Sequence, residues 1–201
     1  MERDTELTKL AILTAAEEVF ARHGFEGTSL QQVGDAAGVS RSTPGYFFGN
    51  KTALYEAVLA RVVERAQTAM LDAHKEIESF TTPHEAVAAY VSALVEFLAH
   101  DQGYLRLIQR EALGGASRIA SLIGPPIEDT LVALAPAAEQ AGITPQRLLL
   151  DVFALCWYPF AHEHTLLPAL NMRPRDRTFI DDHKEHVVAL VRALMRDGPN
   201  A

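Results

Sequence analysis

Apolar residues recur at helical spacing along almost the entire chain, and this periodicity constrains the fold more than any other feature of the sequence. In a helix, residues three and four positions apart share a face, whereas a half-buried strand needs strict alternation. The segment from Leu10 to Phe20 follows the helical pattern, and no segment shows sustained alternation. Clusters of Gly and Pro interrupt the pattern where loops are expected. The sequence therefore predicts an all-α fold.

About nine helices are expected from this pattern. The first covers roughly residues 7–23, and the fourth runs from Lys51 towards Ser79. Later helices are expected near residues 84–100, 102–113, 125–141, 145–168 and 177–196. Residues suited to capping a helix N-terminus precede the second, third and fourth helices: Thr28 or Ser29, Ser40 or Ser42, and Asn50.

The composition suits a compact chain with a sizeable core. Of the 201 residues, 48% are hydrophobic and 22% are charged, which is too few charges for a disordered chain. The apolar runs are far shorter than the roughly 20 residues that span a bilayer. The segment from Met1 to Asp4 lacks the layout of a signal peptide, and the single cysteine, Cys156, suits a reducing compartment. We therefore expect a cytoplasmic protein with no membrane partner.

The stretch from Thr28 to Lys51, TSLQQVGDAAGVSRSTPGYFFGNK, contains the pattern of a helix-turn-helix. Small residues before Gly38 allow two helices to approach each other, Gly38 accepts the positive φ of the turn, and Val39 can pack between the helices. The helix after such a turn can lay its first residues along base edges in the major groove. This stretch therefore predicts DNA binding.

Residues 10–60 resemble the DNA-binding domain of the TetR family of repressors. The resemblance rests on several motifs in a fixed order: FARHGF at 20–25, TSL at 28–30, AAGVS at 36–40, Thr43, Phe47–Phe48 and KTAL at 51–54. Where the family usually has Leu-Tyr after the threonine, this chain has Pro44-Gly45. The resemblance implies a DNA-binding domain over residues 1–50 and a helical effector-binding and dimerisation domain over residues 51–201.

The resemblance also implies which residues contact DNA, because the family's recognition helix corresponds to residues 40–48. Arg41 is expected at guanine O6/N7 or at a phosphate. Hydroxyls at the start of the second helix and the cation at the start of the fourth are expected at phosphates. The expected DNA-binding residues are Thr28, Ser29, Ser40, Arg41, Ser42, Thr43, Tyr46, Phe47 and Lys51. The alternatives are that Arg41 and Lys51 are solvated surface charges and that Tyr46 packs on its own helix.

The net charge argues against DNA binding through general electrostatic attraction between a basic surface and the phosphates. The chain carries −8, and residues 1–56 hold five basic and eight acidic side chains, a net charge of −3. A DNA-binding domain usually has a basic surface. Binding would therefore rest on a few positioned cations, on backbone amides and on two copies acting together. The alternative is a helical protein–protein interaction module whose helix-turn-helix-like domain does not read DNA.

Two copies are expected to bind together, because one short helix-turn-helix reads few base pairs. Recognition helices about 34 Å apart match a palindromic operator. TetR-like proteins form homodimers through their last two helices, which correspond here to residues 145–168 and 177–196. The last helix carries a broad apolar face: Val187, Val188, Leu190, Val191, Leu194 and Met195. This face could equally cover the chain's own core.

The resemblance further implies a cavity for a small-molecule effector, and aromatic side chains with a few polar groups are the usual lining of such a site. The candidate lining residues are Tyr90, Leu94, Phe97, Tyr104, Ile108, Arg110, Glu111, Phe153, Trp157, Phe160 and His162. These side chains could instead simply fill the core. A bound effector is expected to rotate the fourth helix and release the repressor from its operator.

No metal, cofactor or catalytic activity is expected. His162 and His164 point away from each other on a helix, and His183 and His186 have no cysteine nearby. No glutamate lies three residues before a histidine, as a carboxylate-bridged di-iron bundle would require. The sequence also lacks a Gly-rich phosphate loop and a Gly-x-Ser-x-Gly motif. An enzyme is therefore the less favoured class.

Overall fold

The computed structural model describes residues 2–77, 82–115 and 117–196. Within these ranges the chain forms ten helices and no strand, so the predicted all-α fold is confirmed. No helix in the described ranges is both long enough and apolar enough to cross a membrane. The chain divides into two compact units, one containing residues 1–64 and 103–122 and the other residues 65–102 and 123–201.

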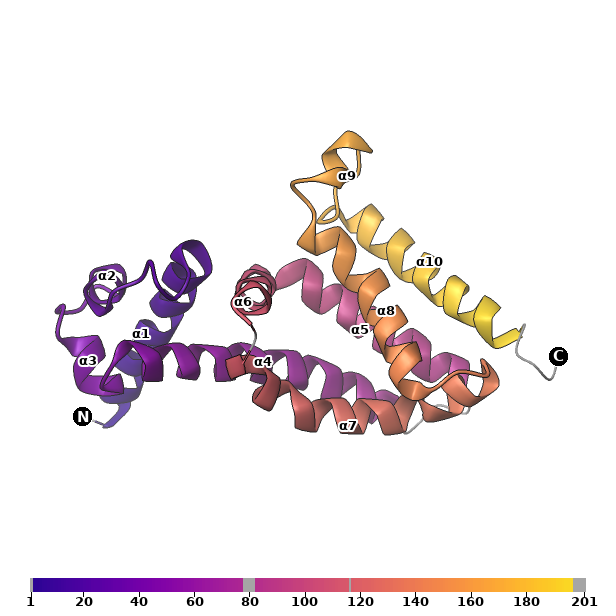
Figure 1. Cartoon of the computed structure of the whole chain (residues 1–201), viewed down its shortest axis with the longest axis horizontal. Helices are drawn as coiled ribbons and strands as arrows, with labels where there is room; N and C mark the ends of the chain where they lie inside the picture. The colour runs from indigo at the N-terminus through magenta and orange to yellow at the C-terminus, as the bar shows by residue number, and fades with distance from the viewer. Residues whose placement is uncertain (1, 78–81, 116, 197–201) are drawn as a thin grey trace. The chain divides into compact units, whose positions relative to one another are not determined.

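The first unit contains the three N-terminal helices, α1 (Glu2–His23), α2 (Leu30–Ala36) and α3 (Thr43–Phe48). It also contains the first half of α4 (Lys51–Ile77), most of α6 (Gln102–Leu113) and the start of α7 (Ser117–Gln140). Helix α1 packs on α2, and α2 packs on α3 (Figure 1). The core of this unit includes residues at helical spacing on α1 and α4: Ile12, Ala16, Phe20, Leu54, Val58 and Val62.

The second unit is built around α5 (Pro83–His100), α8 (Pro145–Ala161) and α10 (Arg177–Arg196), which pack against one another (Figure 1). Thr82 and Thr144 cap the N-termini of α5 and α8 through their hydroxyls. The short helix α9 (Leu166–Ala169) lies between α8 and α10 in the chain. The buried core residues of the three packed helices include Val91, Leu94, Leu98, Leu148, Val152, Cys156, Val187 and Val191.

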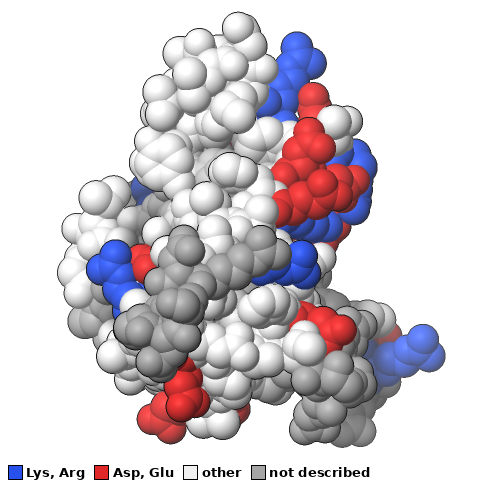
Figure 2. Space-filling view, turned by 90° about the vertical axis from the view of Figure 1, so that its right-hand side faces the viewer, with Lys and Arg blue, Asp and Glu red and all other residues white. Residues whose placement is uncertain are grey.

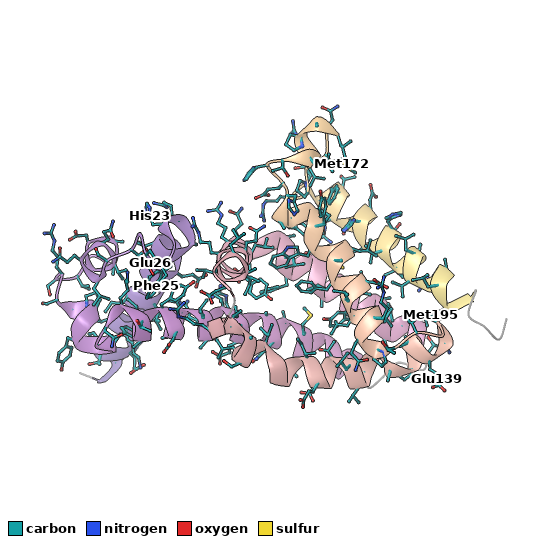
Figure 3. All side chains as sticks on the ribbon, viewed as in Figure 1. His23, Phe25, Glu26, Glu139, Met172 and Met195 are labelled. Carbon is teal, nitrogen blue, oxygen red and sulfur yellow. The ribbon has the colours of Figure 1, made fainter. Side chains whose placement is uncertain are left out.

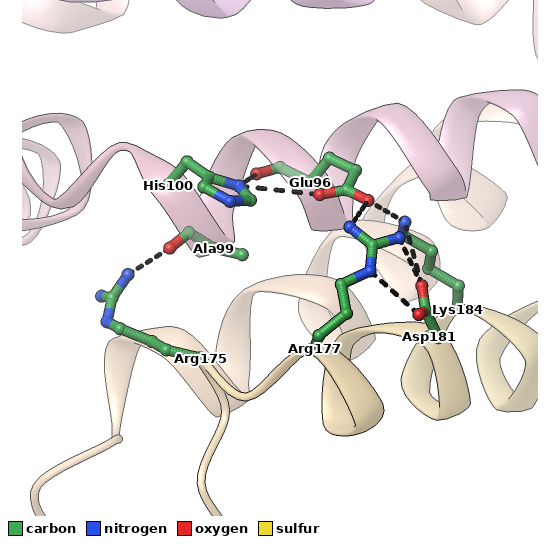
Figure 4. Close-up of polar contacts among 7 residues, drawn as sticks. All are labelled: Glu96, Ala99, His100, Arg175, Arg177, Asp181 and Lys184. Atoms are coloured by element: carbon green, nitrogen blue, oxygen red, sulfur yellow. Dashed lines mark hydrogen bonds and ion pairs between the residues drawn. The ribbon is translucent and has the colours of Figure 1, made fainter.

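An ionic cluster fastens the start of α10 to the end of α5 (Figure 4). Glu96 of α5 accepts hydrogen bonds from Lys184 and from Arg177 Nη1, the latter at 2.8 Å. Arg177 also holds Asp181 one turn further along α10, with contacts of 2.9 and 2.5 Å. Partial burial acts to raise the pKa of Glu96, but these cations outweigh it and lower the pKa below its usual value.

Three predicted helix boundaries were wrong. Helix α1 begins at Glu2 rather than at residue 7. Helix α7 begins at Ser117 rather than at residue 125 and runs through the expected break at residues 124–126. Proline keeps a helix-compatible φ there, and the apolar face continues on both sides with Ile119 and Leu134 buried. The helix is therefore continuous across residues 124–126, although two prolines there cannot donate backbone hydrogen bonds.

Helix α8 ends at Ala161, although the sequence predicted a helix to residue 168. The chain leaves the helix at His162, and Arg175 then binds Glu163 through two contacts of 2.6 and 3.2 Å. Arg175 also donates to the carbonyl of Ala99 on α5. These contacts close the loop around α9, and they join residues that helical periodicity does not relate. The expected end of the fourth helix at Ser79 lies outside the described residues.

Candidate nucleic-acid interface

The helix-turn-helix is fixed by a capped helix and a close backbone approach. Ser29 forms a capping box with Gln32 at the start of α2. Gly38 has a φ of +68°, which a side chain would disfavour, and the amide of Val39 donates to the Gly34 carbonyl at 3.0 Å. A Cβ atom on Gly34 would lie 3.0 Å from the Ser40 carbonyl oxygen, so the backbone of the turn approaches α2 closely at this glycine. Asn50 caps α4 through the amide of Ala53, as predicted.

Hydroxyl side chains gather at the start of α3. The Ser40 hydroxyl lies 2.7 Å from that of Thr43 and 3.1 Å from that of Ser42. Ser42 stands at the N-cap position, but its hydroxyl makes no capping bond. The cluster is exposed or half-exposed, so its oxygens are accessible to solvent.

Two aromatic residues follow this cluster on α3. Pro44 lies buried in the first turn, so the departure from the family pattern is accommodated within the helix. Tyr46 is 85% exposed and meets Phe47 edge-on, with ring centroids 5.3 Å apart. Burial therefore does not account for the aromatic ring of Tyr46.

Arg41 projects from the turn and forms an ion pair with Asp35. Its Nε atom donates to Asp35 Oδ1 at 3.1 Å, and both side chains are more than half exposed. Asp35 lies six residues earlier, at the end of α2, and helical spacing does not relate the two residues. Asp35 was therefore not predicted from the sequence, although a glycine inside a short helix at the preceding position signals a close approach.

The remaining predicted DNA-binding residues make contacts within the first unit. The Thr28 hydroxyl is buried and donates to the Gly24 carbonyl at 2.8 Å, so it does not face solvent. The Lys51 ammonium group donates to the Phe25 carbonyl at 3.0 Å and lies 4.5 Å from the centroid of the Phe25 ring. Phe25 follows α1 and is labelled in Figure 3. Lys51 is half-buried, and Ser29 is exposed.

Arg110 and Glu111 link α6 to the helices around the helix-turn-helix. Arg110 donates to the carbonyl oxygens of Ala21 and Arg22, at the end of α1, at 3.0 and 2.7 Å. The buried carboxylate of Glu111 accepts from the Tyr55 hydroxyl of α4 at 2.9 Å. Burial and the neighbouring carboxylate raise the pKa of Tyr55 above its usual value, which keeps the hydroxyl protonated as a donor. Tyr55 was not singled out from the sequence.

The structure divides the predicted effector-pocket lining between the two units. Tyr104, Ile108, Arg110 and Glu111 belong to the first unit. The second unit contains Tyr90, Leu94, Phe97, Phe153, Trp157, Phe160 and His162. Within it, Phe153 and Trp157 stack with ring centroids 5.3 Å apart, while Tyr90, Leu94 and Phe160 are buried. A hollow of about 490 Å³ occurs elsewhere in this unit, around Met172 (Figure 3), and none of the predicted lining residues borders it.

The apolar face of α10 divides into a buried and an exposed stripe. Val187, Val191 and Met195 are buried in the second unit, whereas Leu190 and Leu194 are 39% and 49% exposed. Helix α8 likewise exposes Leu150, Leu155 and Tyr158. Figure 2 shows the molecule from the side on which α8 and α10 lie in Figure 1, and uncharged side chains cover much of this face. One stripe of this face therefore covers the core of the second unit, and the other stripe is exposed.

No group of three or more His, Cys, Asp or Glu side chains in the described ranges is arranged to hold a metal ion. His183 instead approaches the Leu155 carbonyl oxygen at 3.1 Å, and His164 lies beside Glu163. The surface formed by α3 and its turn thus offers hydroxyls, the guanidinium of Arg41 and two aromatic rings for contacts with a ligand.

Comparison with known proteins gives a consistent picture. Residues 12–58 match the family described as bacterial regulatory proteins, tetR family. The HTH-type transcriptional regulator RutR of Escherichia coli K12 is 30% identical over 192 residues, covering 91% of this chain and 88% of the relative. The HTH-type transcriptional activator FasR of Mycolicibacterium smegmatis is 32% identical over 101 residues, covering 50% of this chain and 45% of the relative.

Solved structures share the fold over nearly the whole chain. The fatty acid degradation regulator FadR from Bacillus halodurans has a TM-score of 0.65 and 14% identity, covering 90% of this chain and 94% of the other. A candidate transcriptional regulator from Streptomyces coelicolor has a TM-score of 0.70 and 22% identity, covering 93% and 97%. At these identities the structures establish the fold alone.

Proposed function

Because the chain belongs to the TetR family and is a DNA-binding transcriptional regulator, we propose that it is a repressor whose homodimer binds a palindromic operator. Residues 1–50 would read the DNA, and residues 51–201 would bind the effector and form the dimer. The observation that carries this proposal is the exposed surface of α3 and its turn. There, Arg41 and Tyr46 project from a backbone that Gly34 and Gly38 hold in one geometry.

In the proposed interface, Arg41, Tyr46 and the hydroxyl cluster enter the major groove, with Phe47 at the margin. Ser29 and Lys51 would flank this surface and contact phosphates. Lys51 would have to exchange its bond to the Phe25 carbonyl for a phosphate oxygen, and Thr28 would act only by supporting the loop before α2. Few cations are available, so the affinity depends on two half-sites being bound together.

The dimer would form through α8 and α10. Leu190 and Leu194 lie one turn apart on α10, and Leu150 and Tyr158 are exposed on α8. Exposed apolar residues in this pattern favour a self-complementary contact between two copies. Such a contact would set the spacing of the two α3 helices on the DNA.

A small-molecule effector would bind among the aromatic and apolar side chains of the second unit, around Phe153, Trp157 and Phe160. Helix α6 starts at Gln102 in the second unit and continues into the first, where Arg110 and Glu111 hold α1 and α4. A shift of α6 would therefore pull on the helices that carry the DNA-binding surface, and α4 would transmit a similar shift. An effector that binds the shifted state more tightly would then lower the affinity for the operator by the coupling free energy between the two sites.

The test begins with duplexes enriched by the purified protein from a random-sequence library. A repressor of this kind selects a palindrome, binds it as a dimer and binds less tightly as salt rises. Candidate effectors are then found by thermal stabilisation and added to the bound duplex, which they should release. The alternative is an interaction module that does not read DNA, and such a module enriches no sequence at low salt. Effectors that stabilise the protein without changing duplex affinity would refute the coupling.

A further inference from the structure

Asp35 is an acidic residue at a place where an acid has no evident structural benefit. It is the penultimate residue of α2, and a negative charge near a helix C-terminus opposes the helix dipole. Both side chains of its ion pair with Arg41 are exposed to solvent, and exposed ion pairs contribute little to folding stability. It also places a negative charge beside the proposed DNA surface, where phosphates would repel it. Its presence therefore calls for another explanation.

The geometry of the pair supplies one. Gly34 brings the Ser40–Arg41 backbone against the end of α2, so that Asp35 reaches the guanidinium from a rigid helix. The bond uses Nε of Arg41, which lies on one edge of the planar group. Among the described residues, no hydrogen-bond partner of Arg41 Nη1 or Nη2 is found. The two Nη groups thus present a free pair of donors, and this is the pair that a guanine O6/N7 edge accepts.

We propose that Asp35 is a positioning residue that orients Arg41 to read a guanine in the major groove. This inference rests on the proposed function, since it requires α3 to enter the groove. An arginine on a flexible stem can bind a phosphate in many orientations, but it can bind guanine through two bonds in only a few. Holding Nε in advance removes much of that freedom before DNA is bound. Asp35 therefore acts on sequence discrimination more than on overall affinity.

The experiment uses the full-length protein and the duplex it enriches from a random library. Arg41→Ala first locates the base pair that Arg41 reads, as the position where replacing guanine no longer matters. At that position the wild type should discriminate by about 5- to 150-fold, the range for a bidentate base contact. For Asp35→Asn we expect this discrimination to fall by about threefold or more. Its binding to an unrelated duplex should be unchanged or stronger, because a negative charge has been removed.

Two controls separate positioning from charge. Glu26→Gln removes one negative charge from the exposed loop before α2, from a residue that takes no part in the ion pair, and should leave discrimination unchanged. Asp35→Asn placed in the Arg41→Ala background should no longer alter discrimination, because the residue to be positioned is gone. Circular dichroism tests whether each variant is folded. We expect that each is, because the side chains of Glu26, Asp35 and Arg41 are all exposed.

The outcomes distinguish this inference from the proposed function. If the wild type enriches no duplex, the proposed function fails. If the wild type enriches a duplex but Arg41→Ala changes no base preference, Arg41 contacts phosphate and the positioning role is refuted. The role is equally refuted if Asp35→Asn and Glu26→Gln change affinity alike and leave base discrimination intact.

Discussion

His183 of α10 donates a hydrogen bond to the Leu155 carbonyl of α8 that the helix itself cannot supply. The usual donor to this carbonyl is the amide of residue 159, which is a proline and has no N–H. His183 Nε2 lies 3.1 Å from the oxygen, and since a carbonyl only accepts, Nε2 must carry the hydrogen. The imidazole stacks on Phe179 with ring centroids 5.4 Å apart. A side chain 28 residues away thus supplies the missing donor to the Leu155 carbonyl and links α8 to α10.

Replacing His183 by alanine should destabilise the fold by about 1 kcal/mol, the typical net value of one hydrogen bond. The Leu155 carbonyl would lose its partner, and α10 would lose a bond to α8. Thermal unfolding at pH 8 measures the effect. His186→Ala, an exposed histidine on the same helix, serves as the matched control. Equal melting temperatures for the two variants would show that this bond contributes nothing.

The same histidine should make stability depend on pH. Burial lowers the pKa of His183 below its ordinary value of 6.5, and His186 adds to this, although the bond to Leu155 partly opposes it. The unfolded chain therefore binds a proton more readily than the native state. The stabilising contribution is complete above pH 6.5 and is lost as the pH falls through the lower native pKa. Melting curves from pH 8 to 5 should show the wild type losing its advantage over His183→Gln. Parallel curves would contradict this.

Arg41→Ala should weaken binding to the enriched duplex by about 1–3 kcal/mol and leave the fold intact, because the side chain is mostly exposed and its ion pair with Asp35 is exposed too. Fluorescence anisotropy with a labelled duplex measures the loss. Lys9→Ala removes one positive charge from α1 and is the matched control for general electrostatics. A loss no greater than that of the control would remove Arg41 from the interface.

Gly34→Ala should destabilise the first unit by about 1–3 kcal/mol, the cost of overpacking. The new Cβ would lie 3.0 Å from the Ser40 carbonyl oxygen and 3.1 Å from Arg41 Cα, and both are backbone atoms that move only with the turn. Gly45→Ala is the contrast, because its Cβ would meet only Leu30 Cδ1 at 3.7 Å. That change should be neutral or stabilise α3 by up to about 1 kcal/mol. The melting temperature should therefore fall for Gly34→Ala and stay the same or rise for Gly45→Ala, and similar losses for the two variants would contradict the packing argument.

Tyr55→Phe should cost about 1–3 kcal/mol, because it leaves the buried Glu111 carboxylate without its hydroxyl donor. Tyr46→Phe removes a hydroxyl from an 85% exposed ring and should change stability by less than about 0.5 kcal/mol. Chemical denaturation at pH 7 compares the two. If both variants match the wild type, solvent or another group satisfies Glu111.

The amino-acid sequence by itself determined the fold class and the helix-turn-helix. Both depend on short-range relations: apolar residues three and four positions apart, Asn50 before α4, and Gly38 at the turn. The prediction from local sequence was wrong at residues 124–126, where glycine and two prolines predict a break between helices. The helix nevertheless continues through these residues, and α7 has buried apolar residues before and after them, Ile119 and Leu134.

Only the tertiary structure decided which side chains meet across the chain. Asp35 reaches Arg41, Arg110 reaches the end of α1, and Tyr55 reaches Glu111. The structure also divided the apolar face of α10 into a stripe in the core and an exposed stripe. None of these pairings follows from spacing, because each joins segments whose relative placement depends on packing the whole unit. Periodicity predicts which face of a helix is apolar. What that face and the polar residues beside it contact depends on the elements that pack against the helix.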